Sequence, residues 1–247
     1  LGPSLSAGWG MNSLQPAYML EDLMIIDRRE IGTHQLPYIV AEISGNHNGN
    51  LDNALKLINA AHDAGANSVK FQCFEPEALA AKRVGIMWRE LPMTYDQLVS
   101  LYRKTHTPKV WYPKMIEQCA KVGIDWFASA FSPEDVAFLE TINCPRYKIS
   151  AYEMLDGDLI NAIAQTGKPV IMSVRSTDRI TILEATDYNG NLAPLGLSDH
   201  SPMGWGGTLG RPMVERHIML ADVPNEDQDF SSAPDEFAKY VNAIRCP

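Results

Sequence analysis

Two lysines stand inside short apolar segments of this 247-residue sequence. Lys70 lies in SVKFQ and Lys148 in YKIS, where most neighbouring side chains are apolar. An ammonium group buried without a partner costs several kcal/mol, so each lysine needs a negative charge beside it. Two lysines directed into one pocket suit an anion such as a phosphate or a carboxylate. The alternative is structural, with each lysine held in a salt bridge by Glu42 or Glu153.

Two histidines, His200 and His217, follow successive apolar segments near the C-terminus. Two imidazoles and a carboxylate form a donor set for a divalent metal ion. The alternative is a pair of pocket histidines that only donate and accept hydrogen bonds, because no HxH, HExxH or CxxC spacing is present. His47, in the loop sequence GNHNGN, is a candidate ligand or base, and equally a candidate cap of its own loop.

Segments typical of buried strands recur along the chain, and helical patterns separate the earlier ones. Such alternation indicates βαβ units and a parallel sheet, and eight units are the number in a (β/α)₈ TIM barrel. We therefore predict an α/β fold of this class. The expected strands are 38–43, 68–72, 125–129, 146–150, 169–173, 180–185, 193–198 and 212–217. The expected helices are 51–65, 110–123, 132–142, 156–167 and 234–245.

Functional side chains of such barrels gather at the C-terminal ends of the strands. Most of the candidate residues stand at or just beyond the ends of expected strands, so we predict that they meet around one opening of the barrel. They include Glu42, Lys70, Gln72, Ser129, Lys148, Glu153, Ser173, Tyr188, Ser198, His200, Glu215 and His217.

Three connections are short for a parallel barrel, in which neighbouring strands need a crossover of about a dozen residues. Six residues separate 169–173 from 180–185, seven separate 180–185 from 193–198, and thirteen precede 212–217. Either the barrel is interrupted there or segments are missing from the sequence. We favour missing segments, because the flanking stretches still have the pattern of barrel strands.

The composition excludes several function classes. Thirty acidic against 21 basic residues give a net charge of −9, which excludes a basic nucleic-acid footprint. No apolar run reaches the roughly 18 residues of a membrane span. The four cysteines are scattered, as buried thiols of a cytoplasmic protein would be. We expect residues 1–30 to form a flexible leader and 31–247 to form the barrel domain.

Five segments, taken in order, resemble the sialic acid synthase family. They are YIVAEISGNHNGNLDNALKLINAAHDAGANSVKFQ, YKISAYE, KPVIMS, GLSDHS and VERH, and the resemblance extends over about residues 36–245. The stretch LYRKTHTP is similar to the pseudaminic acid synthase branch. The resemblance implies condensation of phosphoenolpyruvate with an open-chain N-acylated amino sugar, giving a nine-carbon sialic-type acid and releasing phosphate by C–O cleavage.

The resemblance also implies partners and residue roles. Lys70 and Lys148 match catalytic positions, and His200 and His217 match the ligands of a divalent metal, usually Mn²⁺, with Mg²⁺ or Co²⁺ as alternatives. Family members are homodimers that bind phosphoenolpyruvate and an N-acetylated amino sugar. Ser129, Ser173 and Ser198 match positions that hold phosphoenolpyruvate. Glu42, Gln72, Tyr188, Glu215 and Asp227 match the sugar and metal region, and Glu153 matches a carboxylate that handles protons.

Three features depart from the family pattern. Ala151 stands where a serine is usual, SVRST replaces the usual Gly-Met after the fifth expected strand, and the C-terminal antifreeze-like domain is expected to be absent. Two other functions therefore stay open beside the synthase. One is a barrel aldolase that forms a Schiff base on Lys70 or Lys148, and the other is a degenerate barrel that binds a sugar or phosphoenolpyruvate without turnover.

Overall fold

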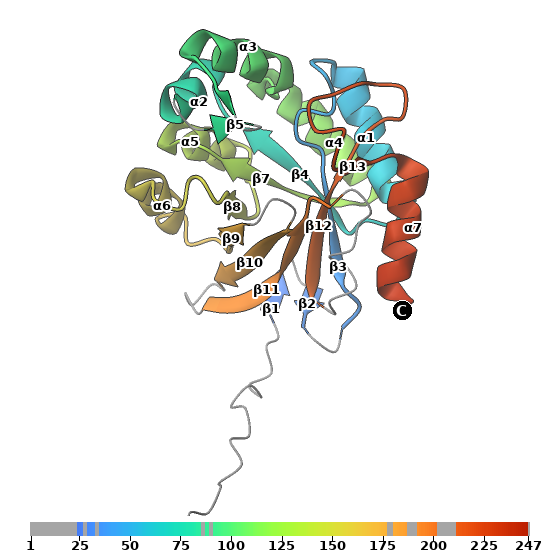
Figure 1. Cartoon of the computed structure of the whole chain (residues 1–247). Helices are drawn as coiled ribbons and strands as arrows, with labels where there is room; N and C mark the ends of the chain where they lie inside the picture. The colour runs from blue at the N-terminus through green and yellow to red at the C-terminus, as the bar shows by residue number, and fades with distance from the viewer. Residues whose placement is uncertain are drawn as a thin grey trace, which may run out of the picture.

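A closed barrel of eight strands forms the centre of the computed structural model (Figure 1). The structure describes residues 24–26, 29–32, 35–84, 87–88, 91–176, 180–186, 192–201 and 211–246. Around the barrel the strands are β3 (Tyr38–Glu42), β4 (Ser68–Cys73), β7 (Asp125–Ala130), β8 (Tyr147–Ile149), β9 (Val170–Ser176), β10 (Ile180–Thr186), β11 (Leu192–Asp199) and β12 (Met213–Ile218). Pairing of β11 with β12 closes the ring, and the short β13 (Ser231–Ser232) extends beside β12. The predicted TIM-barrel class is confirmed.

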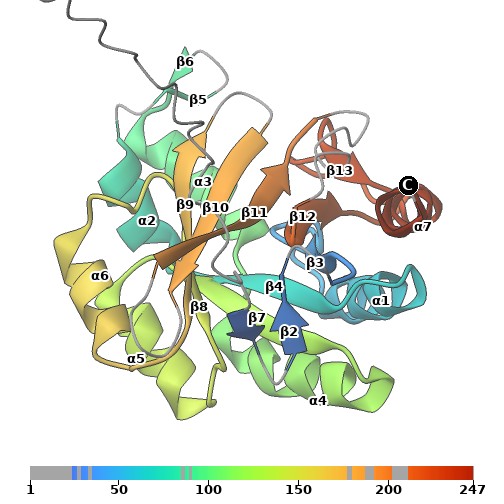
Figure 2. The same cartoon turned by 90° about the horizontal axis from the view of Figure 1, so that it is seen from below.

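Helices cover the outside of the barrel, and all five expected helices form (Figure 2). Asn50 and Ser132 each begin a helix by accepting a backbone N–H with the side chain, while Gly123 ends one with a left-handed φ of 80°. Their apolar faces pack on the outward side chains of the strands to form the main core. These helices are α1 (Leu51–Asp63), α4 (Tyr112–Val122, preceded by the 3₁₀ turn Lys109–Trp111), α5 (Pro133–Thr141), α6 (Gly157–Ala164) and α7 (Pro234–Arg245).

An excursion between β4 and α4 contains two helices that the sequence analysis did not predict. They are α2 (Pro76–Arg83) and α3 (Tyr95–Thr105), separated by the two-residue strands β5 (Met87–Trp88) and β6 (Leu91–Pro92). Both have sequence signals, because α2 begins with a proline and α3 begins with a capping box between Thr94 and Gln97. The excursion stands beside the C-terminal end of β4 (Figure 1).

The interior of the barrel has an apolar part and a polar part. The apolar part contains Val40, Phe127 and Leu183, and it is completed by Ile31 from the hairpin of β1 (Met24–Ile26) and β2 (Arg29–Ile31). Toward the C-terminal ends of the strands, buried charged and hydroxyl side chains replace the apolar ones. Residues 1–23 lie outside the described part of the chain, so the flexible leader and the domain boundaries stay predictions.

Strand β10 corrects the expectation that all eight strands are parallel. It is antiparallel to both β9 and β11, whereas the other pairs around the ring are parallel. Only residues 177–179 join β9 to β10 and only 187–191 join β10 to β11, which is too short for a crossover, so the chain reverses twice. These connections, and 202–210, lie outside the described residues. The preference for missing segments therefore stays a prediction.

The seam between β11 and β12 requires a glycine. A Cβ on Gly196 would lie 1.9 Å from the carbonyl oxygen of Met213, its partner residue in β12. Only a residue without a side chain allows the two backbones to approach this closely.

Candidate active site

A cavity of about 650 Å³ opens at the C-terminal ends of the barrel strands. Because β10 runs in the opposite direction, it contributes Thr181 from its N-terminal end. The excursion adds an apolar wall that includes Phe74, Leu79 and Tyr102. Ten of the residues proposed from the sequence line this cavity: Lys70, Gln72, Ser129, Lys148, Ser173, Ser198, His200, Glu215, His217 and Asp227.

Four of the buried side chains form a charge cluster, which consists of Glu42, Lys70, Lys148 and Glu215. The Nζ of Lys70 lies 2.7 Å from Oε2 of Glu42 and 2.9 Å from Oε1 of Glu215. The Nζ of Lys148 lies 2.6 and 2.8 Å from the two oxygens of Glu215. None of the four side chains is more than 5% exposed. Two positive and two negative groups make the cluster neutral overall.

The cluster shifts the protonation of its members. Burial lowers the pKa of Lys70 well below its ordinary value, and the charge of Lys148 lowers it further against the attraction of Glu215. Burial alone would raise the pKa of Glu215, but the two lysines hold it well below its usual range. Ser198 donates a hydrogen bond of 2.7 Å to the same carboxylate. Glu215 is therefore ionised, and its carboxylate forms ion pairs with both lysines.

The structural alternative for the lysines is present for one of them. Lys70 pairs with Glu42, as that alternative requires, and both lysines share Glu215. Glu153 instead forms an ion pair with Arg83 of α2 and accepts a hydrogen bond from Ser150. Sequence reasoning missed Arg83, because a basic residue in the last turn of a helix is commonplace and its partner lies 70 positions away.

The two histidines lie side by side at the rim of the cavity. Their ring centroids are 5.3 Å apart, and the ring of Phe230 makes a T-shaped contact with each of them. Burial, and then the proximity of His217, lowers the pKa of His200 to about 3, so this ring is neutral and has a free lone pair for a metal or a hydrogen bond.

Asp227 is the carboxylate beside this pair. Its Oδ2 lies 3.4 Å from Nδ1 of His217, a buried nitrogen without a hydrogen bond. Burial would raise the pKa of Asp227, but His217, with smaller contributions from Ser44 and His200, lowers it. Among the described residues, no group of three or more His, Cys, Asp or Glu side chains is arranged to hold a metal ion. Two imidazoles and a carboxylate are nevertheless the donor types that a divalent metal ion takes, with the carboxylate here beside His217 as an outer partner.

A polar network behind the barrel wall holds the two strands that carry these histidines. Asp199 accepts hydrogen bonds from the N–H and Oγ of Ser201, at 2.9 and 2.6 Å, and from Tyr240 at 3.1 Å. Arg216 donates to the carbonyl of Ser201 at 2.9 Å and to Ser232 at 2.7 Å. Residues 199 and 201 flank His200, and residue 216 precedes His217, so the network fixes the backbone on both sides of the pair.

His47 organises its own loop, which is the second of the two roles considered for it. Its Nδ1 accepts the N–H of Gly49 at 3.1 Å, so Nε2 carries the proton and donates to Oγ1 of Thr107, also at 3.1 Å. Burial, with a smaller contribution from His106, lowers the pKa of His47 to about 4. The ring is fully buried and is not among the cavity residues.

This buried neutral histidine predicts a pH-dependent loss of stability. Its folded pKa lies below the unfolded value of about 6.5, so the unfolded chain binds the extra proton as pH falls from about 6.5 to 4. The wild type should lose about 2–3 kcal/mol of unfolding free energy by pH 4.5 from this group. Urea unfolding at pH 7 and pH 4.5 should show a smaller loss for His47→Gln than for wild type and for the exposed-site control His62→Gln. Equal losses in all three would contradict this role.

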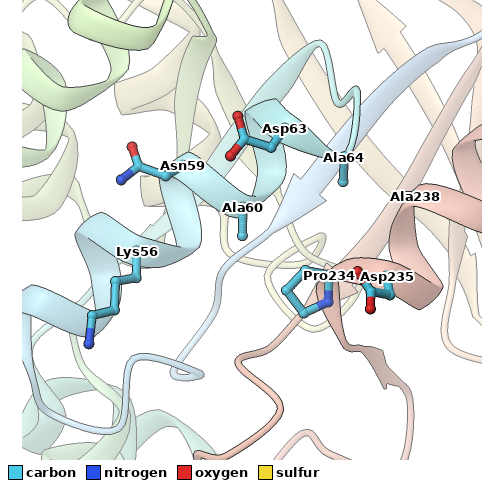
Figure 3. A pocket seen from close by; sticks show the side chains of 8 residues that line it. All are labelled: Lys56, Asn59, Ala60, Asp63, Ala64, Pro234, Asp235 and Ala238. Carbon is cyan, nitrogen blue, oxygen red and sulfur yellow. The ribbon is translucent and has the colours of Figure 1, made fainter.

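A second cavity of about 420 Å³ lies on the outside of the barrel between α1 and α7 (Figure 3). Alanines 60, 64 and 238 leave it open, and Lys56, Asp63 and Asp235 stand at its edges. None of the residues proposed from the sequence lines it. We therefore assign the candidate active site to the cavity at the strand ends.

Three proposed residues do not line the main cavity as described. Glu42 and Glu153 are buried one contact behind it, against Lys70 and Arg83. Tyr188 lies outside the described residues. The last described residue before it, Thr186, pairs with Val170 at the start of β9, which is the opposite end of the barrel.

No helix in the described ranges has the length and apolar character needed to cross a bilayer.

Comparison with known proteins gives one consistent family. The NeuB family model matches residues 57–191. The chain is 31% identical over 259 residues to the pseudaminic acid synthase of Helicobacter pylori, covering 85% of this chain and 74% of that protein. It is 30% identical over 260 residues to the pseudaminic acid synthase of Campylobacter jejuni, covering 86% and 74%. The structure of an N-acetylneuraminic acid synthetase from Leptospira borgpetersenii in complex with citrate has the same fold, with a TM-score of 0.74 at 22% identity over 91% and 89% of the two chains.

The alignment with the Helicobacter protein is longer than the part of this chain that it covers. The matched 85% of this chain amounts to about 210 residues, so about 49 of the 259 positions aligned with the Helicobacter protein have no counterpart here. The family model matches more than half of the chain, and two pseudaminic acid synthases are at least 30% identical to it over most of its length. The chain therefore belongs to the NeuB family, within the branch of the pseudaminic acid synthases.

Proposed function

We propose that the protein condenses phosphoenolpyruvate with an open-chain N-acylated amino sugar to form a nine-carbon sialic-type acid and inorganic phosphate. Its relatives named above are pseudaminic acid synthases, which favours a diacetamido-dideoxy-altrose sugar. The observation that carries the proposal is the pair of buried lysines joined by Glu215 at the floor of the cavity. The family resemblance implies a cytoplasmic homodimer, and sedimentation velocity tests the oligomeric state.

The lysines are proposed to bind the anionic groups of phosphoenolpyruvate. Lys70 and Lys148 would contact its phosphate and carboxylate, with Ser129, Ser173 and Ser198 as hydroxyl donors along the same wall. In the structure the ammonium groups are neutralised by Glu42 and Glu215. An incoming anion therefore competes with these carboxylates, and it is attracted because each ammonium donates up to three hydrogen bonds.

The histidine pair is proposed to hold a divalent metal, with Mn²⁺ as the first choice and Mg²⁺ or Co²⁺ as alternatives. His200 and His217 would be its ligands, and Asp227 would orient His217 through Nδ1. When bound, such an ion polarises a carbonyl oxygen as a Lewis acid, which suits the aldehyde of the open-chain sugar. Gln72 donates hydrogen bonds to Glu42 at 3.3 Å and Ser44 at 3.2 Å, and these groups would line the sugar side.

The proposed reaction joins C3 of phosphoenolpyruvate to the aldehyde carbon of the sugar. The attack leaves C2 electron-deficient and turns the aldehyde oxygen into an alkoxide. Water adds to C2 and passes one proton toward Glu153, and a proton returned from Glu153 converts the alkoxide to a hydroxyl. The tetrahedral intermediate then expels phosphate by cleavage of the C2–O bond, the proton of the C2 hydroxyl leaves with the phosphate, and C2 becomes the keto carbon of the product. Lys70 and Lys148 stabilise the negative charge on phosphate and carboxylate throughout.

The direct test is phosphate release from phosphoenolpyruvate in the presence of Mn²⁺. We expect release with the diacetamido-dideoxy-altrose sugar and slower release with N-acetylmannosamine. Product mass should equal the sum of both substrates plus water minus phosphoric acid. Calorimetric binding of phosphoenolpyruvate without phosphate release from either sugar would contradict the synthase and support the degenerate barrel.

A Schiff-base aldolase is kept as a second candidate because of one observation. Burial lowers the pKa of Lys70, which increases the fraction of neutral amine available as a nucleophile. Borohydride added with the sugar and phosphoenolpyruvate would reduce an imine and fix the substrate to the lysine. The synthase forms no imine, so covalent labelling seen by mass spectrometry at residue 70 or 148 would replace the synthase proposal with the aldolase.

A further inference from the structure

We infer that Arg83 is a positioning residue that holds Glu153 in place for proton transfer. The inference rests on the proposed synthase function, in which Glu153 accepts a proton. Arg83 is the last residue of α2, and its side chain reaches from the excursion to the loop between β8 and α6. It lines the cavity, although its side chain is only 11% exposed.

Both carboxylate oxygens of Glu153 are occupied by neighbouring donors. Nη2 of Arg83 forms an ion pair with Oε1, and Oγ of Ser150 donates to Oε2. The guanidinium group also lies over the ring of Tyr152, 4.2 Å from the ring centroid, which is a favourable cation–π contact. The Glu153 side chain is 3% exposed. The orientation of this carboxylate is therefore held from two sides, by Arg83 at the end of α2 and by Ser150 in the loop that carries Glu153.

An arginine in this place performs two tasks. Its positive charge offsets the cost of burying the carboxylate charge of Glu153. Its planar guanidinium also restricts the rotation of the carboxylate more than a flexible ammonium group does. Glu153 is then held ready to accept a proton, although it stands one contact behind the cavity surface.

The preceding residue, Lys82, provides a matched control. Its Nζ donates to the carbonyl of Phe131 at 2.7 Å and pairs with Asp156 at 2.6 Å. Lys82 thus joins the same helix end to the same loop, but its described contacts do not include Glu153. A general loosening of the excursion should appear in Lys82→Met and Arg83→Met alike, whereas loss of positioning should appear only at Arg83.

The experiment measures steady-state phosphate release by wild type, Arg83→Met, Arg83→Lys, Lys82→Met, Glu153→Gln and the double variant Arg83→Met/Glu153→Gln. We expect Arg83→Met to lower kcat by about 100-fold or more, the scale of a general base effect, with KM for phosphoenolpyruvate changed less than about threefold. Arg83→Lys should recover part of this loss. Lys82→Met should stay close to wild type, and the double variant should be no slower than Glu153→Gln alone.

Each outcome decides the inference. The positioning role is overturned if Lys82→Met and Arg83→Met lose kcat equally. It is also overturned if the kcat losses of Arg83→Met and Glu153→Gln multiply in the double variant. If circular dichroism shows that Arg83→Met does not fold, Arg83→Lys replaces it. The effect of Arg83→Lys on kcat, measured with and without the Glu153→Gln substitution, then completes the double-mutant cycle. No phosphate release by wild type overturns the proposed function and this role with it, whereas release by wild type with an undiminished Arg83→Met overturns this role alone.

Discussion

Lys148→Met is expected to lower kcat/KM for phosphoenolpyruvate by about 10³-fold, the scale of a lost buried charge contact. The variant removes an ammonium group that lies at the cavity floor and leaves a side chain of similar length. Binding should suffer with turnover, so titration calorimetry should show little or no heat with phosphoenolpyruvate. Phosphate release within about tenfold of wild type would contradict the assignment of Lys148 to the substrate anion.

The same variant should also be less stable, and a second substitution separates the two effects. Without Lys148, the buried cluster carries one positive and two negative charges, which should cost about 3–5 kcal/mol. Lys148→Met/Glu215→Gln leaves the balanced pair of Lys70 and Glu42 and should recover much of the melting temperature. Activity should stay lost in both variants. Recovery of activity together with stability would mean that Lys148 is only structural.

Lys168→Met is the matched control for this experiment. Lys168 also pairs with a glutamate, Glu140, at 2.5 Å, but it is 24% exposed and lies outside the cavity. A partly exposed pair of this kind contributes about 1 kcal/mol or less. We expect normal turnover and a small change in melting temperature.

His217→Ala and His200→Ala are each expected to abolish metal-dependent phosphate release. Loss of an outer partner of a metal ligand typically costs 10–100-fold in affinity, and loss of a ligand should cost more than about 100-fold. Electron paramagnetic resonance of Mn²⁺ titrated into each variant measures this loss without reference to turnover. Full binding and full turnover in both variants would refute the assignment of the metal to this pair.

His62→Ala serves as the control for the histidine variants. His62 is on the outer face of α1, where it pairs with Asp63 and is 44% exposed. Its replacement should leave both Mn²⁺ binding and turnover unchanged. A loss of Mn²⁺ binding in His62→Ala similar to that in His217→Ala would indicate adventitious surface binding.

The sequence predicted the strands well because their buried positions leave little choice of residue. Each of the eight observed strands begins and ends within a few residues of the expected range. Ten of the proposed site residues meet in one cavity for a related reason, since barrel geometry brings the ends of distant strands together. Family membership and this convergence support each other, and neither depends on the contacts of single side chains.

Features that depend on pairing across long sequence distances were missed. Glu215 binds both Lys70 and Lys148 and so links three strands. The sequence analysis considered Glu42, which does pair with Lys70, and Glu153, which does not pair with either lysine, but it did not consider Glu215. The predicted direction of β10 was wrong, because an apolar pattern reads the same in both directions along a strand. Only the lengths of the connections indicate the reversal. Helix α2 is short and weakly amphipathic, whereas α3 has a capping box and an amphipathic pattern comparable to that of α6, which the sequence analysis overlooked.

Because β10 is reversed, its two ends lie at opposite ends of the barrel and offer two different attachment points for protein engineering. β9 ends and β10 begins at the cavity, where Thr181 borders the ligand space, whereas β10 ends and β11 begins at the far end. A peptide grafted between Ser176 and Ile180 would be attached at the cavity end of the barrel, where its size could restrict access to the cavity. A peptide grafted between Thr186 and Leu192 would stand a barrel's length away, as a handle for immobilisation on a support.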